Sequence, residues 1–345
     1  MERGNGVECG KFLYRIKKTT QGLYLRNLFW FLIVNHTSII AVGGINQNDE
    51  IFNVEHISTA NDTCNVVGME KSIYGNPMVF TTPISEDLLV CGGNNNFRKC
   101  KILVDNRKWK NFEFKASETS HFNSSRIRSC AATTRHASYI FGGTMGENKA
   151  SYEYMLASEK IWRKGEMLIP DGLENGCAVT ISDDEIWLIG GEKGKQKKRV
   201  LSFNTTTHNF TNAGFGLKQD RWSHRCSLMP DKSGVMVTGG TSKSTEIINL
   251  KTRKSTVVGS MKKTRALHGI GTLVINNAPT LVVFGGYAFE IPDRNISEVY
   301  HDSFEKYDPR TRKWSIWDGA TLKTPRRDFG FATLKPSMIC KDAKK

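Results

Sequence analysis

The side chains best suited to metal or acid–base chemistry lie far apart in this sequence. Imidazole is a favoured ligand of transition metals, but no two histidines stand at a close ligand spacing. The sequence also lacks a nucleophile elbow, a phosphate-binding loop and a Cys-x-x-Cys pair. We therefore predict no catalytic residue, no metal site and no cofactor, and we interpret His224 and His268, which precede predicted strands, as structural. The eight histidines are His36, His56, His121, His136, His208, His224, His268 and His301.

A second chemical feature is the excess of basic side chains. The formal net charge is +15 and the isoelectric point is about 9.4. Long-range steering then favours an acidic partner, either an anionic protein segment or a sulfated or otherwise acidic glycan. Nucleic acid is disfavoured as a partner, because no recognition fold or stacking motif accompanies the charge.

The elements that carry these side chains are predicted to be strands. Gly is abundant (31 residues) and Pro scarce (9), and β-branched and aromatic residues recur in short runs. The longest apolar run near the N-terminus, Leu28 to Val34, is far shorter than the roughly 20 residues of a membrane helix. The sequence therefore predicts an all-β protein without a membrane span.

An internal repeat organises these strands. Each of six glycine doublets follows a short apolar run, such as Leu281 to Phe284 before the last one, and successive doublets are 49, 50, 48, 49 and 46 residues apart. Near-continuous apolarity predicts strands buried on both faces, and two glycines allow a sharp turn after each strand. The doublets are Gly43-Gly44, Gly92-Gly93, Gly142-Gly143, Gly190-Gly191, Gly239-Gly240 and Gly285-Gly286.

The segments between the doublets also repeat in a fixed order. After the last doublet come Ser303 to Pro309, then the aromatic Trp314, then arginines ahead of small and apolar positions in Arg326 to Gly330. This order, with its period near 50, resembles the kelch repeat, and the best single copy is Leu281 to Leu334. The resemblance extends over nearly the whole chain.

Two repeats depart from the kelch pattern. The first has Cys64 to Val67 where the Trp is expected, and the repeat before Gly190 has Glu174 to Gly176 where the Arg is expected. We expect both to fold, because each blade of a repeat protein contributes to a core that it shares with its neighbours.

The resemblance implies a kelch-type β-propeller that forms a single domain over residues 1–345, with four antiparallel strands in each blade. If each innermost strand starts about fourteen residues before its doublet, the complete repeats cover approximately 29–325. The remaining segments, 1–28 and 326–345, add up to nearly one period and contain strand-like runs at Phe12 to Ile16, Phe329 to Leu334 and Ser337 to Cys340. We predict that the termini form a seventh, closing blade, which would remove exposed sheet edges. The alternative is a propeller of six blades.

Kelch propellers generally bind ligands on the face that carries the loops after the doublets and the loops that lead into the innermost strands. By this resemblance the face should be strongly basic here, and the long segment Tyr287 to Asp302 after the sixth doublet should lie on it. The alternatives are that the lysines are solvated, that the repeated arginines hold the blades together, and that the long segment is a disordered excursion. The predicted ligand-binding residues are Lys193, Lys195, Lys197, Lys198, Arg199, Lys262, Lys263, Arg265, Arg326 and Arg327.

The leading functional hypothesis is a protein-interaction module, not an enzyme, that binds an acidic partner through this basic face. Only 42 residues precede the first doublet, too few for the BTB domain that couples related propellers to ubiquitin ligases. The alternative is an extracellular carbohydrate-binding or carbohydrate-active propeller, because copper-dependent galactose oxidase and a sialic acid mutarotase share the kelch-type fold.

Cysteine positions allow two disulfides. Cys91 and Cys100 flank the second doublet on strands predicted to be neighbours, and Cys130, Cys177 and Cys226 hold comparable innermost-strand positions in consecutive blades. These placements allow the pairs Cys91–Cys100 and Cys177–Cys226. The Cys-Gly-Gly pattern at Cys91 also resembles secreted animal kelch proteins.

The compartment follows from the cysteines and from possible glycosylation. Six Asn-x-Ser/Thr sequons add to the indication of an extracellular glycoprotein. No signal peptide is recognised, and a cytoplasmic protein with buried, reduced cysteines is the alternative. The sequons begin at Asn35, Asn61, Asn123, Asn204, Asn209 and Asn295.

Overall fold

A computed structural model of the chain describes residues 38–47, 49–59, 77–81, 88–91, 100–104, 108–112, 126–143, 150–159, 161–192, 197–290 and 297–334. The chain divides into two units, Met1–Ile33 and Val34–Lys345, and every described residue belongs to the second. The predicted strand at 12–16 and the predicted run at 337–340 therefore lie outside the described residues.

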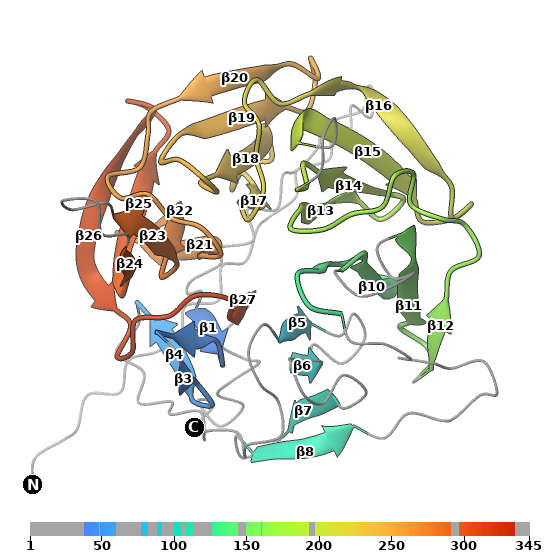
Figure 1. Cartoon of the computed structure of the whole chain (residues 1–345), viewed down its shortest axis with the longest axis horizontal. Helices are drawn as coiled ribbons and strands as arrows, with labels where there is room; N and C mark the ends of the chain where they lie inside the picture. Colours follow the sequence, from blue (N-terminus) through green and yellow to red (C-terminus); the bar gives the residue numbers. More distant parts are fainter. Residues whose placement is uncertain are drawn as a thin grey trace, which may run out of the picture. The chain divides into compact units, whose positions relative to one another are not determined.

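Within the second unit, six antiparallel sheets stand in a ring, each with its strands ordered outward from the centre (Figure 1). We number these sheets as blades 1 to 6 and name the strands of each from the innermost outward. Blade 1 consists of β27 (Gly330–Leu334), β1 (Ser38–Val42) and β4 (Val54–Ser58). Blade 2 consists of β5 (Met78–Thr81), β6 (Leu88–Cys91), β7 (Cys100–Val104) and β8 (Lys108–Phe112). Blade 3 consists of β9 (Cys130–Thr133), β10 (Ala137–Phe141), β11 (Tyr152–Leu156) and β12 (Trp162–Lys164).

The second half of the ring repeats this pattern and adds a hairpin in blade 6. A second, two-residue ladder follows the first doublet. Blade 4 consists of β13 (Cys177–Ser182), β14 (Glu185–Ile189), β15 (Arg199–Asn204) and β16 (Phe210–Gly216). Blade 5 consists of β17 (Arg225–Leu228), β18 (Gly234–Thr238), β19 (Thr245–Asn249) and β20 (Ser255–Val258). Blade 6 consists of β21 (Gly269–Ile275), β22 (Ala278–Phe284), β25 (Ser303–Asp308) and β26 (Lys313–Thr321). The short ladders are β2 (Ile45–Asn46) with β3 (Asp49–Glu50), and β23 (Tyr287–Glu290) with β24 (Ser297–Tyr300).

The ring closes through the C-terminal strand. Strand β27 pairs with β1, from Ser38 opposite Leu334 to Val42 opposite Gly330, and it contacts the innermost strands β21 and β5 on either side. It is thus the innermost strand of blade 1. The predicted seventh blade from 1–28 and 326–345 is not formed by Gly330–Leu334, because this strand after the last repeat takes the place expected for a strand before the first doublet. The six-blade alternative describes the arrangement of the described residues.

The strands before the doublets form the inner framework of the blades, as their apolar composition predicted. All five residues of β1, β10 and β18 are buried. Six apolar clusters lie between consecutive blades, and the last joins blade 6 to blade 1. Trp162 and Trp314 on the outermost strands are part of these clusters, and the Trp314 indole donates a hydrogen bond to Thr245 Oγ1 of the preceding blade at 3.2 Å.

The two glycines of a doublet have different packing roles, which blade 5 illustrates. Gly239 has φ of 67°, and a Cβ there would stand 2.2 Å from the carbonyl oxygen of Arg265 in the loop that leads into blade 6. Gly240 has φ of 95°, and a Cβ there would stand 2.6 Å from the carbonyl oxygen of Trp222 in its own blade. The lack of a side chain at Gly239 therefore leaves room for the loop that leads into the next blade. The lack of one at Gly240 leaves room for the loop of its own blade.

Both predicted cysteine pairs are placed as disulfides. Cys91 and Cys100 face each other on β6 and β7 with their Cα atoms 4.1 Å apart. Cys177 and Cys226 join the innermost strands of blades 4 and 5, with a Cα separation of 6.0 Å. Cys130, the comparable residue of blade 3, is a buried free thiol whose pKa burial raises to about 12, although Arg225 lowers it.

Candidate binding face

A buried arginine and a buried glutamate clamp the loop that leads into blade 6. The Arg265 Nε donates to Glu305 Oε1 at 3.1 Å, and its Nη1 donates to the carbonyl oxygen of Gly285 at 2.7 Å. Its Nη2 donates to Ser303 Oγ at 3.0 Å. The Arg265 and Glu305 side chains are fully buried, so this one guanidinium ties the lead-in loop to the doublet and to the third strand.

The same glutamate also holds the lead-in loop by its backbone. The amide of Lys262 donates to Glu305 Oε2 at 2.5 Å, and the amide of Lys263 donates to Oε1 at 3.1 Å. A carboxylate with this many donors can be buried as an ion, because each donor replaces a lost hydrogen bond to water.

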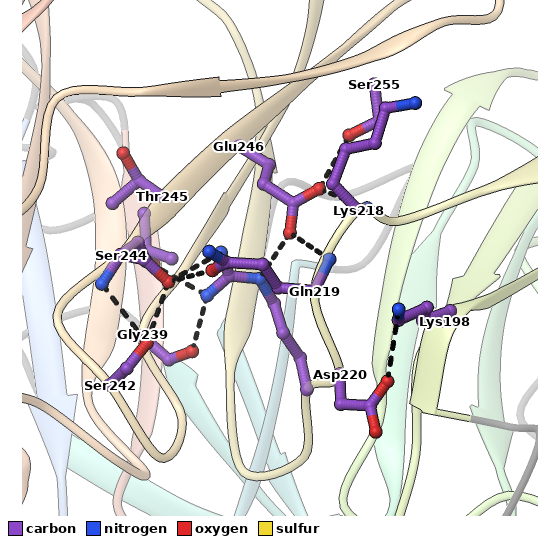
Figure 2. Close-up of polar contacts among 12 residues, drawn as sticks. Lys198, Lys218, Gln219, Asp220, Gly239, Ser242, Ser244, Thr245, Glu246 and Ser255 are labelled. Carbon is purple, nitrogen blue, oxygen red and sulfur yellow. Dashed lines mark hydrogen bonds and ion pairs between the residues drawn. The ribbon is translucent and has the colours of Figure 1, made fainter.

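Blade 5 repeats the clamp, with Arg221 and Glu246 as the pair. Figure 2 shows the Glu246 carboxylate receiving bonds from the amides of Lys218 and Gln219, at 2.6 and 3.2 Å, and from the Ser255 hydroxyl at 2.7 Å. The Nη1 of Arg221 reaches the carbonyl oxygen of Gly239 at 2.9 Å.

Blades 1 and 3 have the same pair. Arg326 bonds to Glu55 and to the carbonyl oxygen of Gly43, the latter at 2.9 Å. Arg126 bonds to Glu153 at 2.8 Å. Four of the blades are therefore held by a guanidinium that spans the lead-in loop, the doublet and the third strand, and in each case Ser or Asn stands two residues before the glutamate.

Blade 4, the repeat that lacks the expected arginine, makes the connection in the opposite direction. Arg199 stands at the start of its third strand, and its Nη1 donates to the Pro170 carbonyl at 2.8 Å and to Asp171 Oδ2 at 3.1 Å. Its Nη2 donates to the Gly172 carbonyl at 3.0 Å. The arginine here extends from the strand to the loop, so blade 4 keeps the tie between these elements without the buried ion pair.

The lead-in loops are also joined to one another by a belt of hydrogen bonds, which we define as Arg128, Asn175, Ser223, Leu267 and Asp328. These five residues hold the same position in blades 3, 4, 5, 6 and 1, and all have positive φ, between 51° and 61°. The amide of each of the last four donates to the carbonyl of the belt residue in the preceding blade, at 2.8 to 3.1 Å. The belt therefore couples the left-handed backbone of each lead-in loop to that of the next loop.

We call the side of the ring formed by the lead-in loops and the segments after the doublets the loop face. Three predicted lysines lie on it with exposed or half-buried side chains: Lys197, Lys262 and Lys263. Lys198 is exposed, with its Nζ 3.7 Å from Asp220 Oδ1. Arg327 is half-buried and pairs with Glu298 at 3.3 Å.

Three of the predicted ligand-binding arginines make these contacts within the protein. Arg265 and Arg326 are fully buried in clamps, and the Arg199 side chain is only 11% exposed against the loop that it holds. Their guanidinium donors are directed to carbonyl and carboxylate oxygens of the protein. Such contacts are what the alternative interpretation, that the repeated arginines hold the blades together, expects. Lys193 and Lys195 lie outside the described residues.

Sequence reasoning missed the glutamates and several lysines. The signal for the glutamates was the pattern Ser/Asn-x-Glu after four of the six doublets, in phase with the arginines. Lys218 and Lys323 are exposed and stand three residues before a clamp arginine, as Lys262 does. Their backbone amides donate to the buried glutamates. The spacing of three residues before each clamp arginine would therefore have identified both lysines.

The two histidines singled out as structural are buried beneath the doublets. His268 Nε2 lies 2.8 Å from Thr238 Oγ1, and the His224 ring packs so closely that a Cβ on Gly190 would be 2.5 Å from it. Burial, with nearby arginines, lowers the pKa of His224 to about 3 and the pKa of His268 well below 6.5. Both rings are thus neutral packing elements.

Among the described residues, the innermost strands line a cavity of 170 Å³ and another of 380 Å³. Arg225 lines the first, where its Nη1 donates to the His224 carbonyl at 3.1 Å. Among the described residues, no group of three or more His, Cys, Asp or Glu side chains is placed to hold a metal ion. No described helix is long and apolar enough to span a membrane.

Six sheets around a closed ring define the class of protein as a β-propeller. Among the described residues five of these sheets have four strands, and blade 1 has three, the innermost of them the C-terminal strand β27. The kelch motif matches residues 270–316, which run from β21 into β26 of blade 6. The chain is therefore a kelch-repeat β-propeller, a fold that generally serves as a protein-interaction module. No curated protein matches the chain.

The clamp predicts a large cost for losing a single buried guanidinium. Replacing Arg265→Met should lower the free energy of unfolding by about 3–5 kcal/mol, because the Glu305 carboxylate is left buried and uncompensated. The double variant Arg265→Met/Glu305→Gln should lose less, since the stranded charge is gone. Chemical denaturation measures both, with the exposed Arg310→Met as the matched control. A cost for Arg265→Met no greater than that of the control would contradict the clamp.

The buried histidines predict a loss of stability on acidification. Burial lowers the pKa of His301 to about 4 and the pKa of His224 to about 3, whereas both are near 6.5 in the unfolded chain. The unfolded chain therefore takes up protons first, and the free energy of unfolding should fall as the pH drops from about 6.5 toward 4.

The variants His301→Gln and His136→Gln isolate this effect in urea denaturation at pH 7 and pH 5. His301→Gln should reduce the difference in unfolding free energy between the two pH values. His136 is exposed, and its replacement should leave the difference unchanged. An equal pH dependence in His301→Gln and the wild type would show that this histidine does not contribute.

Proposed function

We propose that the loop face binds an acidic segment of a partner protein. The observation that carries this proposal is the repeated presentation of Lys218, Lys262 and Lys323. Each is exposed at the same point of a lead-in loop, and the backbone amide of each donates a hydrogen bond to a buried glutamate. None of the three forms an ion pair with an acidic side chain of the described residues, so their charges face solvent.

The fixed backbone supports binding as well as folding. Binding to this surface loses less conformational entropy, because its loops are already ordered. Lys197, Lys243 and Lys263 add positive charge from neighbouring loops. The acidic side chains of this face stand mostly beside cations, as Asp220 does beside Lys198 and Glu298 beside Arg327, which leaves the lysine-bearing loops basic.

A protein segment is the occupant that the fold class favours, because kelch propellers generally bind proteins. A sulfated glycan would meet the same charges, so the binding assay must contain both kinds of polyanion. Extracellular carbohydrate binding remains the competing function and predicts a preference for the glycan.

The charge on the loop face predicts a site-specific loss of acidic binding. The variant Lys262→Glu/Lys263→Glu should elute from immobilised poly-glutamate at lower salt than the wild type, because two steering cations become anions. Its melting temperature should stay close to the wild-type value, since the clamp uses only the backbone amides of these residues.

The control is Lys251→Glu/Lys254→Glu, which makes the same change in net charge in the exposed turn between β19 and β20, at the opposite end of blade 5. It should elute close to the wild type. Equal losses in both variants would show that binding follows net charge alone and would contradict a site on the loop face. Tighter retention of the wild type on a sulfated glycan than on poly-glutamate would favour the carbohydrate alternative.

A further inference from the structure

The loop face has an aromatic cavity between blades 5 and 6 that the basic side chains alone do not explain. We define this aromatic pocket by Trp222, Thr241, Thr264, Tyr287 and Phe289, which line a volume of 230 Å³. That volume lies below the roughly 300–1,000 Å³ of drug-sized ligand sites and matches a single large side chain better. Phe289 is 59% exposed, one of the few large apolar side chains of the described residues in that state.

The exposed aromatic is carried by a hairpin that bonds to two neighbouring loops. The β23–β24 hairpin carries Phe289, and Tyr287 exchanges two backbone hydrogen bonds with Ala266 of the lead-in loop, at 2.8 and 3.1 Å. The Tyr300 hydroxyl donates to the Gln47 carbonyl at 3.1 Å. These bonds place Phe289 beside the cavity with its side chain exposed.

Cations surround the aromatic pocket. Lys197 Nζ stands 4.5 Å from the centre of the Trp222 ring, and the Arg327 guanidinium stands 4.4 Å from the centre of the Tyr287 ring. Lys263 immediately precedes the lining residue Thr264, and Lys243 follows Thr241 by two residues. Large apolar anchors in a desolvated pocket, with charge at the rim, are the arrangement that concentrates binding energy at protein interfaces.

We propose that the aromatic pocket anchors one large apolar side chain of the partner segment, flanked in that segment by Asp or Glu. This inference rests on the proposed function and adds the specificity that charge alone does not supply. The flanking carboxylates would meet Lys197, Lys243 and Lys263, while the apolar side chain would enter between Trp222 and Phe289. The occupant is thus an acidic linear segment with a single aromatic or long aliphatic residue.

The test selects 16-residue peptides from a random displayed library on the full chain and then measures the affinity of the enriched peptides. We expect enrichment of acidic residues around one large apolar position. Replacing that position by Ala should weaken binding about tenfold or more, and Phe289→Ser and Trp222→Phe should each weaken the parent peptide. Phe289→Ser should not weaken the Ala-substituted peptide further, because the contact is already lost.

The matched control is Val257→Ser, which removes another exposed apolar side chain, 45% exposed, on the outermost strand of blade 5. It should leave affinity unchanged. If Lys262→Glu/Lys263→Glu abolishes binding while the Phe289 and Trp222 variants bind like the wild type, the anchor is wrong and the proposed function stands. If no acidic peptide is enriched, or if charge reversal has no effect, both proposals fail. Binding of a glycan that Trp222→Phe abolishes would overturn the peptide as the occupant.

Discussion

The rest of the structure depends on a buried ion pair between an arginine and a glutamate. A guanidinium and a carboxylate are costly to remove from water, and their mutual attraction repays that cost only when the remaining donors and acceptors are also satisfied. In blade 6, Arg265 and Glu305 meet this condition with a doublet carbonyl, a serine and two backbone amides. The pair is therefore a geometric constraint that sets where three chain segments meet.

In the function proposed for the loop face, that constraint links folding to recognition. The clamp and the belt fix the backbone of the lead-in loops, while the side chains of Lys218, Lys262 and Lys323 remain exposed from it. Blade 4 shows that the position of the loop matters more than the identity of the pair, because Arg199 makes the tie from the opposite side. The same fixed loops support the hairpin that carries Phe289, so charge and apolar surface are presented together.

The sequence predicted the repeat, the strands before the doublets and both disulfide pairs, because glycine doublets and buried strands leave a local signal. It left open whether the repeated arginines hold the blades together or bind a ligand, because Glu305 and Glu55, the partners of Arg265 and Arg326, are distant in sequence. Ring closure was also misplaced. Whether Gly330–Leu334 begins a new blade or completes the first one depends on a pairing with β1 across the whole chain, which no local pattern encodes.

The central claim is that buried glutamates hold the lead-in loops as firmly as the strands. Hydrogen exchange of the amides of Lys218, Lys262 and Lys323 tests it directly, since each donates to a buried carboxylate. The account predicts exchange as slow as that of the buried strand amides of Val237 and Val283, through opening of the whole domain. Exchange as fast as that of the Lys251 amide, which donates only to the Asn249 side chain in the exposed β19–β20 turn, would show that the loops open independently. That result would contradict the account.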